Sequence, residues 1–379
     1  MRSRRKVRLG FIGGGAGSLI GFPHRAAAYY TEQFDIVSGA FSSDSPESRS
    51  FGESLGLEAG RSYDDIDALI AGELALPEGR RTEVVSVLTP NWLHYACAKK
   101  LLEAGFHVLC EKPLALTTAD AIDLTELVAK HKKVFAVAHT YTGYPMLRQM
   151  REMIAAGAIG KVHKIDGQYY QGWINQLIHD PQQRASVWRL DPEKSGQSCC
   201  MADIGVHVFN LIEYATGLTV DQVLADTDTL DPENPLDVDG VALIKTTDGT
   251  RGLIRASQVA TGEENNLVLS VYGHRGGLIW RQETPDVLRF MPEGAPQQLF
   301  KPGHDYNHTL ARESAHLPPG HPEGLVAALA NLYHGVASAV RGESTSPAGY
   351  PDVEAGTRGM RFIEAVMASS RQGQVWVSL

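Results

Sequence analysis

The chain has 379 residues, of which 43% are hydrophobic and 21% are charged, so it is long enough for two domains with an ordinary globular core. The formal net charge of -9 argues against a nucleic-acid partner, because phosphate contacts need clustered lysine and arginine. The 4 cysteines form no C-x-x-C pair, which favours a reduced protein without disulfide bonds.

The amino terminus superficially resembles a twin-arginine export signal. Arg4 and Arg5 precede the apolar stretch "VRLGFIGGGAGSLIGF". Glycines interrupt this stretch, and its removal would delete the first expected strand. No other run reaches the roughly 18 apolar residues of a membrane span. We therefore expect a soluble, cytoplasmic protein with no membrane partner.

Short apolar runs alternate with helical patterns in the first third of the chain. The expected strands lie at 6–15, 34–41, 82–90, 106–111 and 133–141. Helical patterns at 91–105 and 119–132 separate the later strands. This alternation predicts βαβ units and a doubly wound parallel sheet, that is, a Rossmann dinucleotide-binding domain over residues 1–140.

A glycine-rich turn follows the first expected strand. Gly15, Gly17 and Gly21 give G-x-G-x-x-x-G, one residue longer than the usual fingerprint. Glycines allow a tight turn and let the backbone approach a pyrophosphate at a helix N-terminus. A simple tight turn is the alternative, but the position after a strand favours a dinucleotide site.

The second strand ends without the acidic residue that usually binds the ribose of NAD. Ser42 and Ser43 stand there, with Arg49 further on. Serine can bind a ribose hydroxyl, and serine with arginine can also hold a 2′-phosphate. NADP is therefore not excluded. We favour NAD, because a single arginine near Glu47 is a poor phosphate clamp.

Ligands of open α/β sheets bind at the carboxyl ends of the strands. The segments 89–91 and 111–113 both follow strands, so Lys112 is expected to reach the cleft where a nicotinamide would lie. A snorkelling lysine before a prolyl turn is the alternative. The candidate cofactor-binding residues are Gly13, Gly15, Gly17, Ser18, Ile20, Ser42, Ser43, Arg49, Thr89, Pro90, Asn91, His94, Glu111 and Lys112.

Asp203 and His207 are four residues apart in a helical pattern, so both should project from one helix face. A neutral imidazole can accept a proton from an alcohol, and a carboxylate can orient it. An N-capping aspartate with a core histidine is the alternative.

Several motifs occur together along the chain: "GFPH" (21–24), "TPNWLH" (89–94), "EKPLALT" (111–117) and "DIGVH" (203–207). In this combination the chain resembles the glucose–fructose oxidoreductase, inositol dehydrogenase and MocA family. The resemblance implies an N-terminal Rossmann domain and a C-terminal α+β domain on a largely antiparallel open sheet. It also implies that Lys112, Asp203 and His207 match the family's catalytic positions. The longer glycine turn and the two serines depart from the family's pattern.

The second domain is expected over residues 141–379, as the substrate-binding and oligomerisation domain of a homodimer or homotetramer. Residues 145–157 predict a helix, and Asp248-Gly249 predicts a hairpin turn between two strands. The late helix at 352–371 is expected to pack back on the first domain. The four histidines between 304 and 321 lack a tight ligand cluster, so we expect no metal.

A cleft between the domains is the expected substrate site. Its candidate lining is Tyr141, Tyr144, Gln171, Trp173, Trp188, Arg189, His207 and His321. Aromatic faces and hydrogen-bonding groups suit a ring with many hydroxyls, whereas ordinary packing is the alternative for each residue.

The leading hypothesis is an NAD(P)-dependent dehydrogenase that oxidises a secondary hydroxyl of a sugar, a glycoside or an inositol. His207 would take the proton, Asp203 would orient His207, and Lys112 would polarise the oxygen. Lys112 could instead be the base. A glycoside hydrolase working by transient oxidation and elimination needs the same residues. A non-catalytic sugar- and nucleotide-sensing regulator is the third hypothesis.

Overall fold

The computed structural model describes residues 5–178, 187–229, 235–343 and 349–379. The chain forms two compact units. Unit 1 comprises Met1–Ala115, Ala119–Gly143 and Leu325–Thr357, and unit 2 comprises Leu116–Thr118, Tyr144–Gly324 and Arg358–Leu379.

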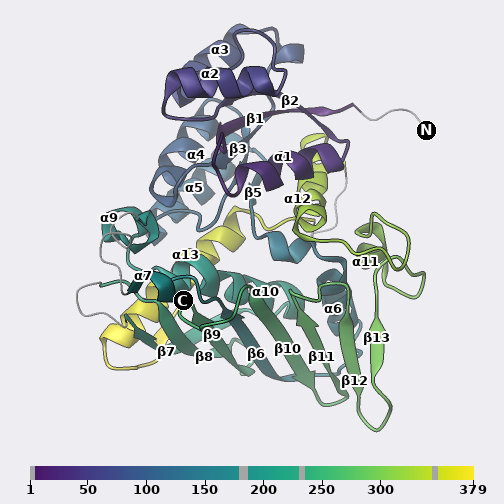
Figure 1. Ribbon diagram of the computed structural model, residues 1–379. Helices are drawn as coiled ribbons and strands as arrows, with labels where there is room; N and C mark the ends of the chain where they lie inside the picture. Colours follow the sequence, from purple (N-terminus) through teal and green to yellow (C-terminus); the bar gives the residue numbers. More distant parts are fainter. Residues whose placement is uncertain (1–4, 179–186, 230–234, 344–348) are drawn as a thin grey trace. The chain divides into compact units, whose positions relative to one another are not determined.

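Unit 1 alternates strands and helices (Figure 1). Its strands are β1 (Val7–Gly13), β2 (Phe34–Ala40), β3 (Val84–Leu88), β4 (His107–Cys110) and β5 (Phe135–Val137). Its helices are α1 (Gly21–Tyr30), α2 (Ser45–Ser54), α3 (Ile66–Ala75), α4 (His94–Glu103), α5 (Thr118–His131) and α12 (Leu325–Val340), with short 3-10 turns at Glu78–Arg80, Asn91–Leu93 and Thr140–Gly143.

The five strands form one parallel sheet in the order β2-β1-β3-β4-β5. Every residue of β3 is buried, as expected for a strand covered on both faces. The strand order reverses at β1, so the loops after β1 and β3 flank the switch point where α/β sheets bind ligands. The predicted doubly wound parallel sheet is confirmed.

Helix α12 is part of the core of unit 1. The compact unit around the parallel sheet includes Leu325–Thr357, although the first domain was predicted to end at residue 140. Leu329, Leu332 and Tyr333 on one face of α12 pack in a cluster with Leu9 and Phe34. An amphipathic helix must bury its apolar face, and α12 buries it here although the segment that precedes it, Tyr144–Gly324, lies in unit 2.

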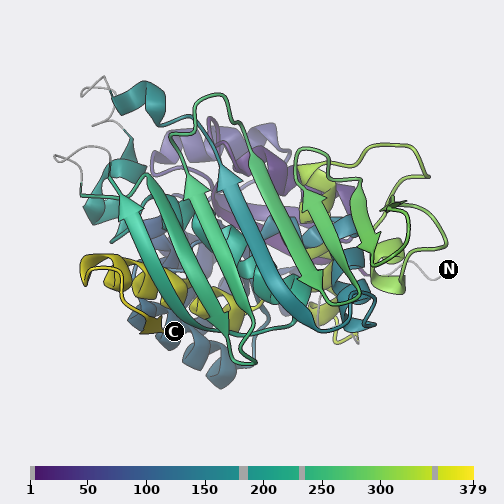
Figure 2. The same cartoon turned by 90° about the horizontal axis from the view of Figure 1, so that it is seen from below.

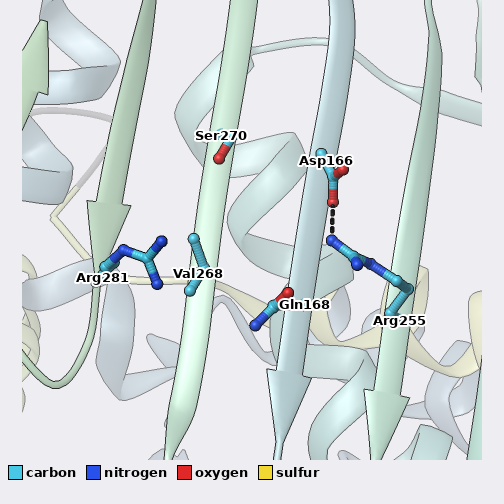
Figure 3. Close-up of a pocket in the computed structure, with 6 residues that line it drawn as sticks. All are labelled: Asp166, Gln168, Arg255, Val268, Ser270 and Arg281. Carbon is cyan, nitrogen blue, oxygen red and sulfur yellow. Dashed lines mark hydrogen bonds and ion pairs between the residues drawn. The ribbon is translucent and has the colours of Figure 1, made fainter.

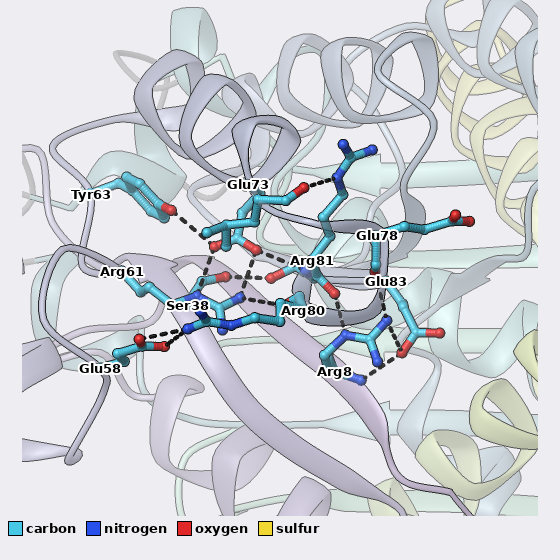
Figure 4. Close-up of polar contacts among 12 residues, drawn as sticks. Arg8, Ser38, Glu58, Arg61, Tyr63, Glu73, Glu78, Arg80, Arg81 and Glu83 are labelled. Carbon is cyan, nitrogen blue, oxygen red and sulfur yellow. Dashed lines mark hydrogen bonds and ion pairs between the residues drawn. The ribbon is translucent and has the colours of Figure 1, made fainter.

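A group of charged residues lies at the amino ends of β1 and β3, away from the switch point (Figure 4). The Glu73 carboxylate is buried and accepts hydrogen bonds from Arg61, Tyr63 and the Thr82 N–H at 2.6 to 3.1 Å. A buried charge that is paired and hydrogen-bonded in this way stabilises local structure. We therefore assign this group a structural role.

Unit 2 is built on a nine-stranded sheet in the order β13-β12-β11-β10-β6-β9-β8-β7-β14. Its strands are β6 (Val162–Tyr170), β7 (Val220–Asp228), β8 (Asp239–Thr246), β9 (Arg251–Ser257), β10 (Asn266–Gly273), β11 (Gly276–Arg281), β12 (Leu288–Pro292), β13 (Gln298–Phe300) and β14 (Val377–Ser378). All neighbouring strands are antiparallel except β6 and β9, which confirms the largely antiparallel sheet.

The helices of unit 2 include a π-helical turn. They are α6 (Pro145–Ala155), α7 (Asn175–Ile178), α9 (Pro192–Ser195), α10 (Val206–Thr216), α11 (Thr309–Glu313), the π-helical turn Met201–Gly205, the 3-10 turn Trp188–Leu190, and most of α13 (Val353–Arg371), whose first turn belongs to unit 1. Among the described residues, none of the helices combines the length and hydropathy that a bilayer-spanning segment needs.

Helix α10 covers one face of this sheet. Gly167 of β6 permits the close approach, because a Cβ there would lie 2.4 Å from Val208 of α10. Residues next to Gly167 in sequence, such as Asp166 and Gln168, point to the opposite face. Figure 2 views the sheet from that opposite face, with the strands in front of α10.

Candidate functional site

The glycine turn folds tightly against the ends of two strands. Gly13 and Gly17 have φ of 77° and 74°, which favours glycine. A Cβ on Gly21 would lie 2.1 Å from the Gly14 oxygen, and one on Gly15 would lie 2.6 Å from the Phe41 oxygen. Helix α1 begins at Gly21, so the longer spacing keeps a glycine where the helix touches the turn. The turn therefore fits a dinucleotide pyrophosphate.

Two further candidates shape the start of α1. The Ser18 hydroxyl accepts a hydrogen bond from the Gly21 N–H at 3.1 Å. Ile20 is the N-cap residue and packs against the core of unit 1. Both residues therefore position the helix N-terminus toward which a pyrophosphate would be drawn.

The end of β2 is acidic in character. The Ser42 hydroxyl donates to the Glu47 carboxylate at 2.6 Å, and Ser43 is exposed. Arg49 forms an ion pair with Asp64. The guanidinium is thus already neutralised, and a 2′-phosphate at Ser42 would meet the negative charge of Glu47.

His94 joins the segments that follow β3 and β4. Its imidazole is fully buried, with Nδ1 2.7 Å from the Pro113 oxygen and Nε2 2.8 Å from the Thr89 oxygen. Burial lowers the pKa of His94, although both carbonyls oppose this. The ring therefore links the backbone that follows β3 to the backbone that follows β4, and Pro90 and Asn91 directly follow Thr89.

Lys112 follows β4 and is half-buried, whereas Glu111 before it is buried. The Glu111 carboxylate contacts His24 Nε2 at 2.9 Å and accepts the Lys112 N–H at 3.1 Å. Burial alone would raise the pKa of Glu111, but the His24 hydrogen bond and the Lys112 charge hold it below its usual value. A carboxylate thus stays ionised beside Lys112 in unit 1.

In unit 2, Asp203 lies in the π-helical turn and His207 in the first turn of α10. Gln258 Nε2 donates to one Asp203 oxygen at 2.8 Å, and Arg189 Nε lies 3.6 Å from the other. The Cys199 thiol donates to Gln258 Oε1, which fixes the orientation of the amide. π-Helical turns are rare and occur mostly at functional sites.

A buried carboxylate supports the start of this π-helical turn. Asp237 accepts the N–H groups of Cys199 and Met201, each at 2.8 Å. Burial raises the pKa of Asp237 even though these hydrogen bonds oppose the shift. The turn that carries Asp203 is therefore held by Asp237 from one side and by Gln258 from the other.

Hydrogen-bonding side chains continue from His207 along the end of β6. The Tyr169 ring lies 6.2 Å from the His207 ring, and its hydroxyl donates to Asn265 at 2.9 Å. Gln171 donates to the same Asn265 oxygen at 2.9 Å and accepts from the Trp173 indole at 3.2 Å. The structure thus brings His207, Gln171 and Trp173 into one row.

The other substrate candidates lie in different surroundings. Tyr144 is 2% exposed and packs on Trp280 in unit 2, while Tyr141 is 9% exposed in unit 1. The Trp188 ring lies under the Arg189 guanidinium at 4.4 Å. His321 is exposed, with Nδ1 3.1 Å from the Pro318 oxygen.

A small polar pocket opens on the other face of the unit 2 sheet (Figure 3). It is lined by Asp166, Gln168, Arg255, Val268, Ser270 and Arg281. Arg255 donates to Asp166 at 2.7 Å. Because side chains alternate along strands, this pocket faces away from α10 and His207.

Two family models match the chain. The NAD-binding Rossmann fold of the oxidoreductase family matches residues 7–139, and the GFO/IDH/MocA C-terminal domain matches residues 147–279. This chain belongs to the Gfo/Idh/MocA family of oxidoreductases. The predicted family is confirmed, and so is the predicted NAD-binding domain.

Relatives of this Gfo/Idh/MocA chain include both named and uncharacterised enzymes. An uncharacterized oxidoreductase of Bacillus subtilis, YfiI, is 31% identical over 98% of this chain and 97% of its own length. Levoglucosan dehydrogenase of Pseudarthrobacter phenanthrenivorans is 30% identical over 60% of this chain and 64% of its own. An inositol dehydrogenase homolog from Azotobacter vinelandii, solved with NADH and myo-inositol, is 34% identical with a TM-score of 0.91, covering 99% and 98% of the two chains.

Three residues at the candidate site of this family member were not singled out from the sequence. Gln258 directly follows β9, and a polar residue at a strand end is a signal that could have identified it. The pairing of β6 with β10 brings Asn265 next to Tyr169, and the sequence did not predict this pairing. The hydrogen bonds of Gln258 to Asp203 and of Asn265 to Tyr169 and Gln171 join segments far apart in the chain.

We expect this Gfo/Idh/MocA protein to bind NAD more tightly than NADP. Replacing Glu47 with glutamine should reduce the ratio of the dissociation constants for NADP and NAD by roughly two- to fivefold, which is the effect of one exposed charge interaction. Quenching of tryptophan fluorescence during titration with each cofactor measures this. Glu103→Gln, at an exposed position on α4, is the matched control. Tighter binding of NADP to the unmodified protein would contradict the expectation.

Proposed function

We propose that this protein is an NAD-dependent dehydrogenase that oxidises a secondary hydroxyl of a sugar, a glycoside or an inositol. The observation that carries the proposal is the arrangement in unit 2. Asp203 and His207 lie at the junction of the π-helical turn with α10, next to a row of hydrogen-bonding amide and aromatic side chains. Such a row suits a ring that carries several hydroxyl groups.

Each candidate residue has a chemical role that its surroundings support. His207 would accept the hydroxyl proton, and Asp203, held by Gln258, would stabilise the charged imidazole. Lys112, beside the ionised Glu111, would donate to the substrate oxygen as a cation. Bound NAD would accept the hydride, and the glycine turn with Ser18 would hold its pyrophosphate.

The relatives support a cyclic polyhydroxylated substrate. One is named as a levoglucosan dehydrogenase, and the inositol dehydrogenase homolog was solved with myo-inositol. Arg189 lies close to Asp203 and over Trp188, so its charge is partly matched within unit 2. We therefore include neutral sugars and cyclitols in the proposed class and exclude sugar phosphates.

Incubation with NAD and a panel of substrates tests the proposal. The panel contains cyclitols, free sugars, levoglucosan, aryl glycosides, sugar phosphates and acyclic alcohols, with NADH and released aglycone followed together. We expect NADH to form with at least one cyclic polyol. Aglycone release without net NADH would instead identify a hydrolase that works by transient oxidation. Preferred turnover of sugar phosphates or acyclic alcohols would contradict the proposed substrate class.

A further inference from the structure

Four buried polar side chains form a continuous chain of hydrogen bonds in unit 1. Ser86 Oγ of β3 lies 2.8 Å from the Tyr333 hydroxyl of α12. The same hydroxyl lies 2.8 Å from His24 Nδ1 of α1, and His24 Nε2 lies 2.9 Å from Glu111. Ser86, Tyr333 and His24 are each 0% exposed, and Glu111 is 8% exposed.

Counting the hydrogen atoms shows which group donates in each of these hydrogen bonds. Among the described residues, the Tyr333 hydroxyl is the one hydrogen-bond partner of Ser86 Oγ, so Ser86 donates to it. The Tyr333 O–H then donates to His24 Nδ1, which leaves the Nε2–H to donate to the Glu111 carboxylate. A neutral His24 in this tautomer satisfies every buried group. A doubly protonated ring would leave the Ser86 hydroxyl hydrogen without an acceptor.

This chain of hydrogen bonds ends at Glu111, the residue before Lys112. One oxygen of the Glu111 carboxylate receives the His24 hydrogen bond, and the other accepts the Lys112 N–H at 3.1 Å. The carboxylate is therefore fixed from both sides, and its negative charge lies beside the Lys112 backbone.

We propose that His24 is a positioning residue for Lys112: its Nε2–H keeps the buried Glu111 carboxylate ionised and oriented, which fixes the backbone and the electrostatic surroundings of Lys112. This inference takes the catalytic role of Lys112 from the proposed function, and no other part of it depends on that function. The ionisation of Glu111 is a separate property that does not depend on turnover. Tyr333 and Ser86 act through His24 by selecting its tautomer.

Several other groups surround this carboxylate in unit 1. The titratable side chains whose pKa is shifted by the charges of Glu111 or Lys112 are His94, Cys110, His139 and Tyr333, and Arg25 lies near Tyr333. Burial raises the pKa of Cys110, so its thiol carries no charge near neutrality. Burial lowers the pKa of both His94 and His139, so they carry little positive charge near neutrality. His24 and Lys112 are then the groups that hold Glu111 ionised.

Two amide substitutions at position 24 separate the proposed role from simple packing. In His24→Gln the amide extends about as far as Nε2 and can still donate to Glu111. In His24→Asn the amide takes the place of Nδ1, keeps a partner for Tyr333, and ends short of Glu111. Both variants are polar, and both are smaller than histidine. A difference between them therefore reports the hydrogen bond to Glu111.

Without that hydrogen bond, burial raises the pKa of Glu111. A group whose pKa is raised becomes protonated as the pH falls. In His24→Asn we therefore expect an infrared band of a protonated carboxylic acid, which His24→Asn/Glu111→Gln lacks. We also expect turnover to fall about tenfold for each pH unit below the new ionisation. The unmodified protein and His24→Gln should show neither change over the same pH range.

The outcomes distinguish this inference from the proposed function. If His24→Asn and the unmodified protein have the same infrared spectrum and the same pH profile, the positioning role is wrong. This holds whatever the turnover of a Lys112→Met variant, which tests the catalytic role of Lys112. If His24→Asn gains the band but Lys112→Met keeps full turnover, the ionisation of Glu111 by His24 stands and the catalytic role of Lys112 is wrong.

Discussion

Replacing Lys112 with methionine is expected to lower turnover by about 10²- to 10⁴-fold, the usual effect of losing a group that transfers or stabilises a proton. Methionine keeps the length of the stem, so the end of β4 should still fold. Lys112 lies beside the ionised Glu111, which favours a cationic side chain at this strand end. Turnover is measured with the preferred substrate of the panel, and cofactor binding is measured by fluorescence.

Lys130→Met is a matched control, because Lys130 is an exposed lysine of the same unit near the end of α5. It should keep full turnover and normal affinity for NAD. A Lys112→Met variant that binds NAD and turns over within about twofold of the unmodified protein would disprove the catalytic assignment.

His207→Gln is expected to lower turnover by a similar factor, about 10²- to 10⁴-fold. If His207 is the base, the variant should also lose the ionisation on the acid side of the pH profile of kcat/KM. Asp203→Asn should give a smaller loss with the ionisation retained, because the amide can still orient the ring but no longer stabilises its charge.

His163→Gln, an exposed histidine on β6, is the control for this pair. The two assignments of the base give different results. If Lys112 is the base, His207→Gln raises KM while the acid-side ionisation remains, and that result would show His207 to be a binding residue only.

Much of the fold could be predicted from local sequence. Runs such as "VVSVL" at β3 are apolar throughout, which is the pattern of a strand buried on both faces. Pro145 and Gly157 mark the two ends of α6, and Asp248-Gly249 forms the turn between β8 and β9. These features depend on residues close in the chain, so the sequence carries them directly.

Other features depend on contacts between distant residues. The apolar stripe of α12 indicates only that one face is buried, and nothing local says that it packs in unit 1. The parallel pairing of β6 with β9 is similarly non-local. The spacing of Asp203 and His207 predicted a helix, but a π-helical turn differs from an α-helix by one residue per hydrogen bond, which no pattern in the segment reveals.

The candidate site shows the same division. Lys112, Asp203 and His207 could be singled out because charged or titratable groups in apolar segments are conspicuous. Gln258 offers only the weak signal of a polar residue at a strand end, and Tyr333 offers none, because a tyrosine on an apolar helix face is ordinary. Their relevance comes from what they hydrogen-bond.

The place of α12 in the core of unit 1 has a consequence for how the protein is made. The strands β1 to β5 leave the ribosome early, but Leu329, Leu332 and Tyr333 follow only after the whole of Tyr144–Gly324. At about 5–20 residues/s this interval lasts on the order of tens of seconds. Until then Leu9 and Phe34 lack part of their packing, and His24 lacks Tyr333. The nucleotide-binding unit therefore cannot complete its core during synthesis before strands β6 to β13 of unit 2 have been made, and fragments ending near residue 140 should aggregate.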